Sequence, residues 1–180
     1  MIAWLWLTLW TSAGAGGDLC VARLPAEVTR EIGVSFPAYA LPRVAHNLTE
    51  DIANNRQHGG DGCLGAAYGD FDGDGTQDVA LLLASPKDDH VLVVVALWRD
   101  GKWQLEQLRT WKSERNRIYV AVAPPGKYKR SESFDYPLSE AGEVESLEST
   151  LPGIVTGRTE ASGIYYFLKT GSWKHVWAID

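Results

Sequence analysis

The sequence DFDGDGTQDVALLLA, residues 70–84, gives the clearest indication of the fold. Its second half, Asp78–Ala84, is a short apolar run that ends at Ser85-Pro86, and such a run is typical of a buried β-strand. Its first half alternates aspartate with other residues and contains two glycines, which is typical of a tight loop. We therefore expect this stretch to be a loop that leads from one strand into the next.

A longer apolar run follows this stretch along the chain. Residues His90–Arg99 are apolar throughout their interior, so both faces of this strand are expected to be covered. Asp100-Gly101 is a two-residue hairpin signal, after which the chain is expected to return through Trp103 and Leu108. We expect this strand pair to form the centre of a sheet, with an N-terminal helix packed on one face.

Local signals predict the remaining elements. Pro25 and the apolar spacing that follows predict a helix over residues 25–32 that ends near Gly33. Asn47, with Glu50 three residues later, offers a cap for a second helix that runs through about residue 56. Further strands are expected at residues 118–123, 154–158, 163–169 and 173–179, with one or two short edge strands within the polar segment 127–150. The prediction is an α+β fold, a mostly antiparallel β-sheet or meander with one or two short N-terminal helices.

The aspartates of the loop have the spacing of a calcium site. The predicted ligands are the carboxylates of Asp70, Asp72, Asp74 and Asp78 and the backbone carbonyl of Thr76. Gly73 and Gly75 supply the positive-φ positions that so tight a loop requires. Mg²⁺ is less suitable because it keeps several waters, and Zn²⁺ because the loop has neither histidine nor cysteine. The alternative is an ordinary solvated turn, which clusters of aspartate and glycine also form.

The loop is not an EF-hand, because the twelfth position, where a bidentate glutamate is needed, is Leu81. Gly69–Gly75, followed by Asp78-Val79-Ala80, resembles instead the calcium loops of FG-GAP and VCBS-type repeats. The resemblance implies the same five ligands between two strands. It covers one loop only, and a propeller needs several four-stranded blades, so a propeller is not predicted. The wider chain is similar to small exported bacterial proteins of unknown function that carry a single such loop.

The N-terminal residues 1–15 are expected to be a signal peptide. Met1–Trp10 is dominated by apolar residues, and the small residues Ala13–Ala15 allow cleavage near their end. No lysine or arginine precedes the apolar core, and the alternatives are a buried N-terminal strand or a retained anchor. Residues 16–180 are then expected to form a single calcium-binding α+β domain in a secreted or periplasmic protein.

The two cysteines, Cys20 and Cys63, are expected to form a disulfide, because an even number of cysteines in an exported chain is usually paired. The alternatives are two unpaired thiols or a metal pair. A metal pair is disfavoured because neither cysteine has another cysteine or a histidine at ligand spacing.

Composition and motifs restrict the function. The formal net charge is -6 and there is no basic cluster, so no nucleic-acid partner is expected, and the mature chain has no apolar run long enough to span a membrane. No nucleophile motif is present. The four histidines are scattered along the chain at His46, His58, His90 and His175. Glu160 and Asp135 are free carboxylates that nothing singles out. No catalytic residue is predicted, and whether the protein is an enzyme stays open.

The expected function is that of a binding or interaction protein in which Ca²⁺ is structural, with a protein or glycan partner that the sequence does not identify. One alternative is an exported hydrolase that acts on cell-wall or glycan material, with its site in the polar region after Pro125. Another is an enzyme inhibitor or immunity-type protein. Tryptophans in strands usually fill cores, but an exposed aromatic platform for a ligand is the alternative for the five of the mature chain, Trp98, Trp103, Trp111, Trp173 and Trp177.

Overall fold

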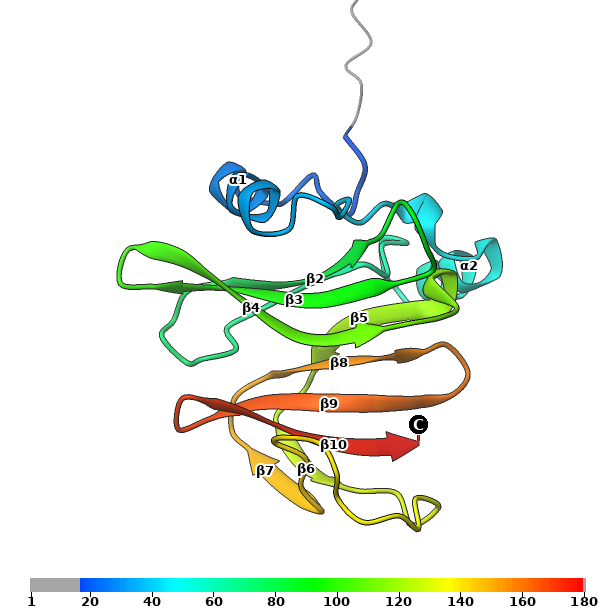
Figure 1. The fold of residues 1–180 in the computed structure, drawn as a ribbon, viewed down its shortest axis with the longest axis vertical. Coiled ribbons are helices and arrows are strands. Elements are labelled where there is room, and N and C mark those ends of the chain that lie inside the picture. The colour runs from blue at the N-terminus through cyan, green and yellow to red at the C-terminus, as the bar shows by residue number, and fades with distance from the viewer. Residues whose placement is uncertain (1–16, 180) are drawn as a thin grey trace, which may run out of the picture.

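The structure is a computed structural model that describes residues 17–179 (Figure 1). The predicted signal peptide, residues 1–15, lies outside the described residues. Within them, two α-helices accompany ten β-strands, and every pairing between strands is antiparallel. The predicted α+β class is confirmed, and the described strands form neither a propeller nor a closed barrel.

The strands form two four-stranded sheets and one two-stranded sheet. The first sheet has the order β1 (Ala66–Gly69), β2 (Asp78–Ala84), β3 (Val91–Arg99) and β4 (Lys102–Trp111). The second sheet has the order β10 (Ser172–Ile179), β9 (Ser162–Lys169), β8 (Gly153–Arg158) and β5 (Ile118–Ala123). The small sheet pairs β6 (Gly126–Lys129) with β7 (Ser146–Ser149). The short strands expected in the polar segment are present, but they pair with each other in a separate sheet and are not edge strands of a main sheet.

The elements stack in four layers, which Figure 1 shows from α1 (Ala26–Ser35) at one end to the small sheet at the other. The main core lies between the two large sheets, where Val93 of β3 and Ile164 of β9 are completely buried. A second cluster joins Val28 and Ile32 of α1 to the other face of the first sheet. Both faces of β2 are therefore covered, and every residue of this strand is buried.

The expected hairpin of β3 and β4 is present, but β4 is an edge strand, so the pair does not form the centre of its sheet, and the presence of two facing sheets was not predicted. Both two-residue hairpin turns have the positive-φ backbone that matches the twist of the flanking strands. In the first turn φ is 52° at Asp100 and 75° at Gly101, and in the second it is 46° at Thr170 and 78° at Gly171. These turns fix the registers that pair Arg99 with Lys102 and Lys169 with Ser172.

The helices differ in detail from the prediction. Helix α1 continues through Gly33 to Ser35, since packing of its apolar face on the first sheet outweighs the helix-breaking tendency of one glycine. Helix α2 (Thr49–Gln57) has Leu48 at its N-cap position and no side-chain cap. The predicted cap at Asn47 is wrong, because its amide nitrogen donates to the carbonyl oxygen of Ile118 at 2.8 Å. Short 3₁₀ helices, η1 (Val44–His46) and η2 (Arg115–Arg117), lie at the entrances to α2 and β5.

The structure contains the Cys20–Cys63 disulfide, with 5.1 Å between the two Cα atoms. It ties the N-terminal segment to the loop that enters β1. The Asp18 carboxylate holds the same segment, since it accepts hydrogen bonds from the N–H groups of Cys20 at 3.0 Å and Val44 at 3.1 Å. Among residues 17–179, neither helix has the length and apolar character that crossing a membrane requires.

Candidate metal centre

The acidic loop spans residues 70–77 and joins β1 to β2, whose pairing begins with Gly69 opposite Asp78. The side chain of Phe71 turns away from the acidic residues and is completely buried in the core between the two large sheets. A Cβ atom on Gly69 would lie 2.7 Å from the Phe71 ring, so only glycine fits at this position. The loop is thus anchored to the core by an aromatic ring between its first two aspartates.

Three of the four predicted carboxylate ligands converge. One oxygen each from Asp70, Asp72 and Asp78 lies within 4.8 Å of the other two. Ligand oxygens around Ca²⁺ lie at about 2.3–2.6 Å from the ion, so oxygens on opposite sides of it are about 5 Å apart. The three carboxylates therefore fit around one hard cation. Asp74 lies outside this group, and its carboxylate accepts a hydrogen bond from the N–H of Thr76 at 2.7 Å.

Backbone N–H groups hold the first carboxylate of the loop. Asp70 accepts hydrogen bonds from the N–H groups of Gly73 at 2.7 Å and of Gly75 at 3.0 Å. These glycines have φ values of 81° and 85°, as the sequence analysis expected. Both positions lie in the left-handed region that favours glycine. The loop is thereby wound tightly around the Asp70 carboxylate.

Of the three convergent aspartates, Asp70, Asp72 and Asp78, only Asp78 is completely buried. Its carboxylate accepts hydrogen bonds from the N–H groups of Phe71 at 2.9 Å and Trp98 at 3.0 Å. Burial raises the pKa of Asp78 to about 6, the two backbone hydrogen bonds oppose this shift, and the negative charges of Asp72 and Asp74 add to it. A cation bound at this point would favour the ionised carboxylate.

A single arginine borders the acidic group. The Nε atom of Arg99 lies 2.8 Å from Oδ2 of Asp72, and its Nη1 atom lies 3.1 Å from Oε1 of Glu106. The other oxygen of Glu106 accepts a hydrogen bond from the Trp173 indole at 2.8 Å. This chain of contacts links the acidic loop to β3, β4 and the second sheet. The sequence analysis missed Arg99, which is 27 residues from Asp72 and follows no recognisable spacing.

The other residues considered in the sequence analysis do not form one site. The tryptophans divide between two places, since Trp98 packs against Trp103 while Trp111 packs against Trp177. Both pairs have edge-to-face geometry, and Trp103, Trp111 and Trp177 are partly buried against the hydrophobic clusters. Glu160 lies in the β8–β9 turn, whereas Asp135 lies in the loop between β6 and β7. The tryptophans are therefore parts of the packing between elements.

Comparison of the chain with protein-family models, with curated proteins and with solved structures found no match in any of the three. Its function is therefore argued from the residues of the site.

A polar network between β4, β9, β10 and the loop before β7 joins the exposed Glu140 to the buried His175, one of the scattered histidines. The His175 ring is stacked on Tyr166, and its Nε2 atom lies 3.2 Å from a Glu140 oxygen. The same Glu140 carboxylate pairs with Arg109, which also donates to the Tyr166 hydroxyl at 2.8 Å. Burial and the charge of Arg109 hold the pKa of His175 below its ordinary value of 6.5, although the Glu140 carboxylate opposes them.

The lowered pKa of His175 predicts that the folded protein loses stability as the pH falls below 6.5. In the folded protein His175 takes up its proton at a lower pH than in the unfolded chain. Above pH 6.5 it is largely neutral in both states, so it does not lower the free energy of unfolding. Below that value the unfolded chain binds more protons, and the free energy of unfolding falls until the lower folded pKa is reached. We expect the urea midpoint to drop more between pH 7 and pH 5 in the wild type than in His175→Gln. Equal drops in the two proteins would contradict this assignment, and the comparison cancels the contributions of titrating groups that do not interact with His175.

Proposed function

We propose that this protein is a secreted or periplasmic domain that binds Ca²⁺ through the loop between β1 and β2, and that its biological role is to bind a partner. The proposed ligands are the convergent carboxylates of Asp70, Asp72 and Asp78, together with the Asp74 carboxylate, which lies outside the convergent group, and the Thr76 backbone carbonyl, both of which the spacing of the loop indicates. The observation that carries the calcium site is the convergence of three carboxylate oxygens within 4.8 Å, one of them from a fully buried aspartate. The disulfide supports export, because disulfides form and persist in oxidising compartments.

The role of the ion in this proposal is structural. The buried Asp78 is the first residue of β2, and it also accepts a hydrogen bond from Trp98 near the end of β3. A cation held by Asp70, Asp72 and Asp78 neutralises charges that otherwise repel one another at the junction of three strands.

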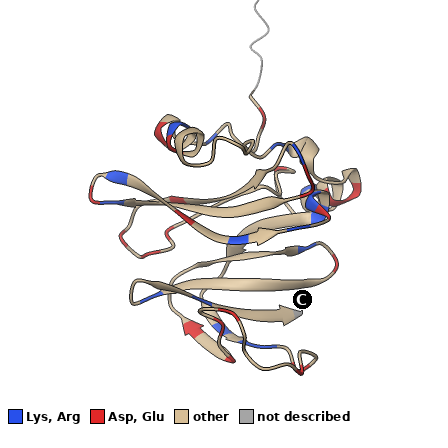
Figure 2. Cartoon of the chain, viewed as in Figure 1, with Lys and Arg blue, Asp and Glu red and all other residues tan. Residues whose placement is uncertain are grey.

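The distribution of charge outside the acidic loop suits a protein or glycan partner better than nucleic acid. In Figure 2, lysine and arginine are dispersed among helices, strands and loops and alternate with acidic residues.

The test is the effect of calcium on unfolding. At a free calcium concentration ten times the dissociation constant, the ion is expected to add about 1.4 kcal/mol to the free energy of unfolding. For a domain of this size that corresponds to a rise in Tm of about 3–6 °C. Asp72→Ala is expected to remove the rise, and EDTA is expected to lower the Tm of the wild type to the calcium-free value. Differential scanning calorimetry with and without Ca²⁺ measures both effects.

Asp135→Ala is the matched control, because Asp135 is an exposed aspartate far along the chain from the loop. It is expected to keep the full response to calcium. A direct readout is the luminescence of bound Tb³⁺ excited through tryptophan. The backbone N–H of Trp98 donates to the Asp78 carboxylate, so this tryptophan lies next to the proposed site. An unchanged Tm in calcium and EDTA, together with no Tb³⁺ emission, would remove the proposal.

A further inference from the structure

The two large sheets meet differently at their two pairs of edges. Where β4 meets β10, Trp111 packs on Trp177, and Trp173 donates to Glu106. Where β1 meets β5, one backbone hydrogen bond joins the strand edge to the chain before β1, from the N–H of Val120 to the carbonyl of Leu64 at 2.9 Å. Beside it lies an open cavity of about 590 Å³. Its wall contains residues from both strands and from the N-terminal segment.

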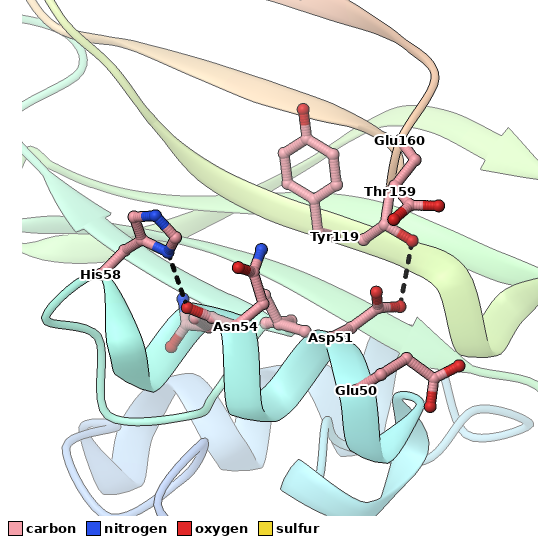
Figure 3. Close-up of a pocket in the computed structure, with 9 residues that line it drawn as sticks. Glu50, Asp51, Asn54, His58, Tyr119, Thr159 and Glu160 are labelled. Atoms are coloured by element: carbon pink, nitrogen blue, oxygen red, sulfur yellow. Dashed lines mark hydrogen bonds between the residues drawn. The ribbon is translucent and has the colours of Figure 1, made fainter.

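A second hollow of about 570 Å³ continues the first between α2 and the β8–β9 turn (Figure 3). Asn55, Leu64 and Tyr119 line both hollows, so the two form one groove, here called the Tyr119 groove. Figure 3 shows Tyr119 rising from β5 between the side chains of α2 and the turn that carries Glu160. The groove does not contain any aspartate of the candidate metal centre.

The wall beside α2 is acidic. Glu50 and Asp51 come from the first turn of the helix, and Glu160 faces them from the β8–β9 turn. Asp51 accepts a hydrogen bond from the Thr159 hydroxyl at 3.0 Å, whereas among the described residues neither Glu50 nor Glu160 has an ion-pair partner. Two exposed carboxylates thus face open space without a compensating cation, which favours a positively charged ligand.

The other end of the groove presents a strand edge. The N–H of Val120 points away from β8 to Leu64, so the N–H of Val122, two residues on, points to the same side. No hydrogen bond of this N–H to another described residue occurs, and the Val122 side chain is 40% exposed. The hydroxyl of Tyr68, also in the wall, is shielded by its neighbours and has no hydrogen-bond partner among the described residues. Such an edge lacks hydrogen-bond partners for its outward backbone groups. An extended peptide supplies them, because its N–H and C=O groups alternate along the chain.

We propose that the Tyr119 groove binds an extended, basic peptide segment of a partner protein. The segment adds as a short strand to the edge of β5 at Val122 and places lysine or arginine side chains against Glu50 and Glu160. A peptide is favoured over a glycan because the strand edge recognises main-chain groups that a sugar does not have. The inference goes beyond the calcium proposal and is independent of it.

The probe is a fluorescent, capped six-residue peptide of alternating lysine and valine, titrated into the full chain and followed by anisotropy. We expect saturable binding that weakens as salt is added, because attraction between exposed charges is screened. Replacing the lysines of the peptide with glutamate is expected to weaken binding by about tenfold or more, since like charges then face each other. The C=O of Val122 points to the same side as its N–H, so methylation of the peptide nitrogens that face β5 removes the donor to this carbonyl and is expected to weaken peptide binding by about tenfold.

Variants of the protein test the same contacts. Glu50→Gln combined with Glu160→Gln is expected to weaken binding by about fivefold, since each exposed charge pair contributes modestly. The matched control combines Glu27→Gln with Asp135→Asn, which are exposed carboxylates outside the groove, and is expected to bind as the wild type does. In ¹⁵N spectra, the amide of Val122 is expected to shift on binding. Asp72→Ala is expected to keep peptide binding, so loss of the calcium response leaves this inference intact.

Three results would overturn the inference. One is equal binding of the lysine peptide and its N-methylated form, which would show that the edge of β5 is not used. Another is equal affinity of the Glu50 and Glu160 double variant and the wild type. The third is saturable binding of a glucosamine tetramer in the absence of any peptide binding, which would assign the groove to a cationic glycan.

Discussion

Phe71→Ala is expected to lower the free energy of unfolding by about 3–5 kcal/mol, as truncation of a large buried aromatic side chain does in other cores. The ring is completely buried between the two large sheets. Its removal leaves a cavity, and the neighbours that would have to close it belong to two different sheets. For a domain of this size the loss corresponds to a fall in Tm of about 6–20 °C.

The consequence extends to the metal centre, because Phe71 lies between Asp70 and Asp72 in the sequence and its N–H donates to Asp78 at 2.9 Å. Without the ring the loop loses its anchor in the core, so calcium is expected to stabilise Phe71→Ala less than the wild type. Urea unfolding with and without Ca²⁺ measures both effects. The control is Phe36→Ala, a partly buried phenylalanine beside α1, for which a smaller loss and an unchanged calcium response are expected. A Phe71 variant as stable as the Phe36 variant would contradict the anchoring role.

Local signals in the sequence were sufficient to predict most strands. The turn residues Asp100-Gly101 and Thr170-Gly171 fix hairpins by short-range geometry, and strand β5 has the predicted bounds, residues 118–123. The division into two facing sheets was not predicted. It depends on which apolar face of each strand meets which other face, and continuous apolar runs such as that of β3 carry no alternation that would indicate this.

In the acidic loop, the spacing of the aspartates was sufficient to predict that Asp70, Asp72 and Asp78 lie close together, because these positions are neighbours in the chain, whereas Asp74 lies outside that group. Arg99 and the buried ring of Phe71 had no such signal, since the first reaches the loop from the end of β3 and the second depends on the opposite sheet. The Tyr119 groove was missed for the same reason. Its walls are assembled from α2, β1, β5 and the β8–β9 turn, which are distant in sequence.

The misplaced cap of α2 shows how a local rule fails. Asn47 followed by Glu50 satisfies the sequence pattern of a capped helix. In the structure the side-chain amide of Asn47 instead satisfies the carbonyl of Ile118 at the start of β5. A buried carbonyl at a strand edge needs a donor, and the helix N-terminus, which is exposed, can use water. The tertiary contact therefore outweighs the capping preference.

Removal of the disulfide by Cys20→Ala with Cys63→Ala is expected to lower the free energy of unfolding by about 4 kcal/mol in the chain-entropy model. The bond closes a loop between residues 43 apart in the sequence, and without it the unfolded chain gains the entropy of that loop. Cys20 is completely buried, so alanine there also removes packing. Reduction of the wild type keeps both sulfur atoms, and the difference between the two experiments separates the crosslink from the packing.

The bond also fixes part of the Tyr119 groove, because Cys63, Leu19 and Arg23 all lie in its wall. Once it is reduced, the N-terminal segment keeps noncovalent contacts only, among them the Asp18 carboxylate, which accepts the N–H of Val44, and Arg23, which lies over the Tyr68 ring. We therefore expect reduction to weaken binding of the lysine peptide more than binding of calcium, whose predicted ligands all follow Cys63, in the β1–β2 loop and at the start of β2. Equal urea midpoints for the oxidised and reduced wild type would show that the crosslink gives no net stabilisation through the entropy of the unfolded chain. The crosslink would then have no stabilising role in this domain.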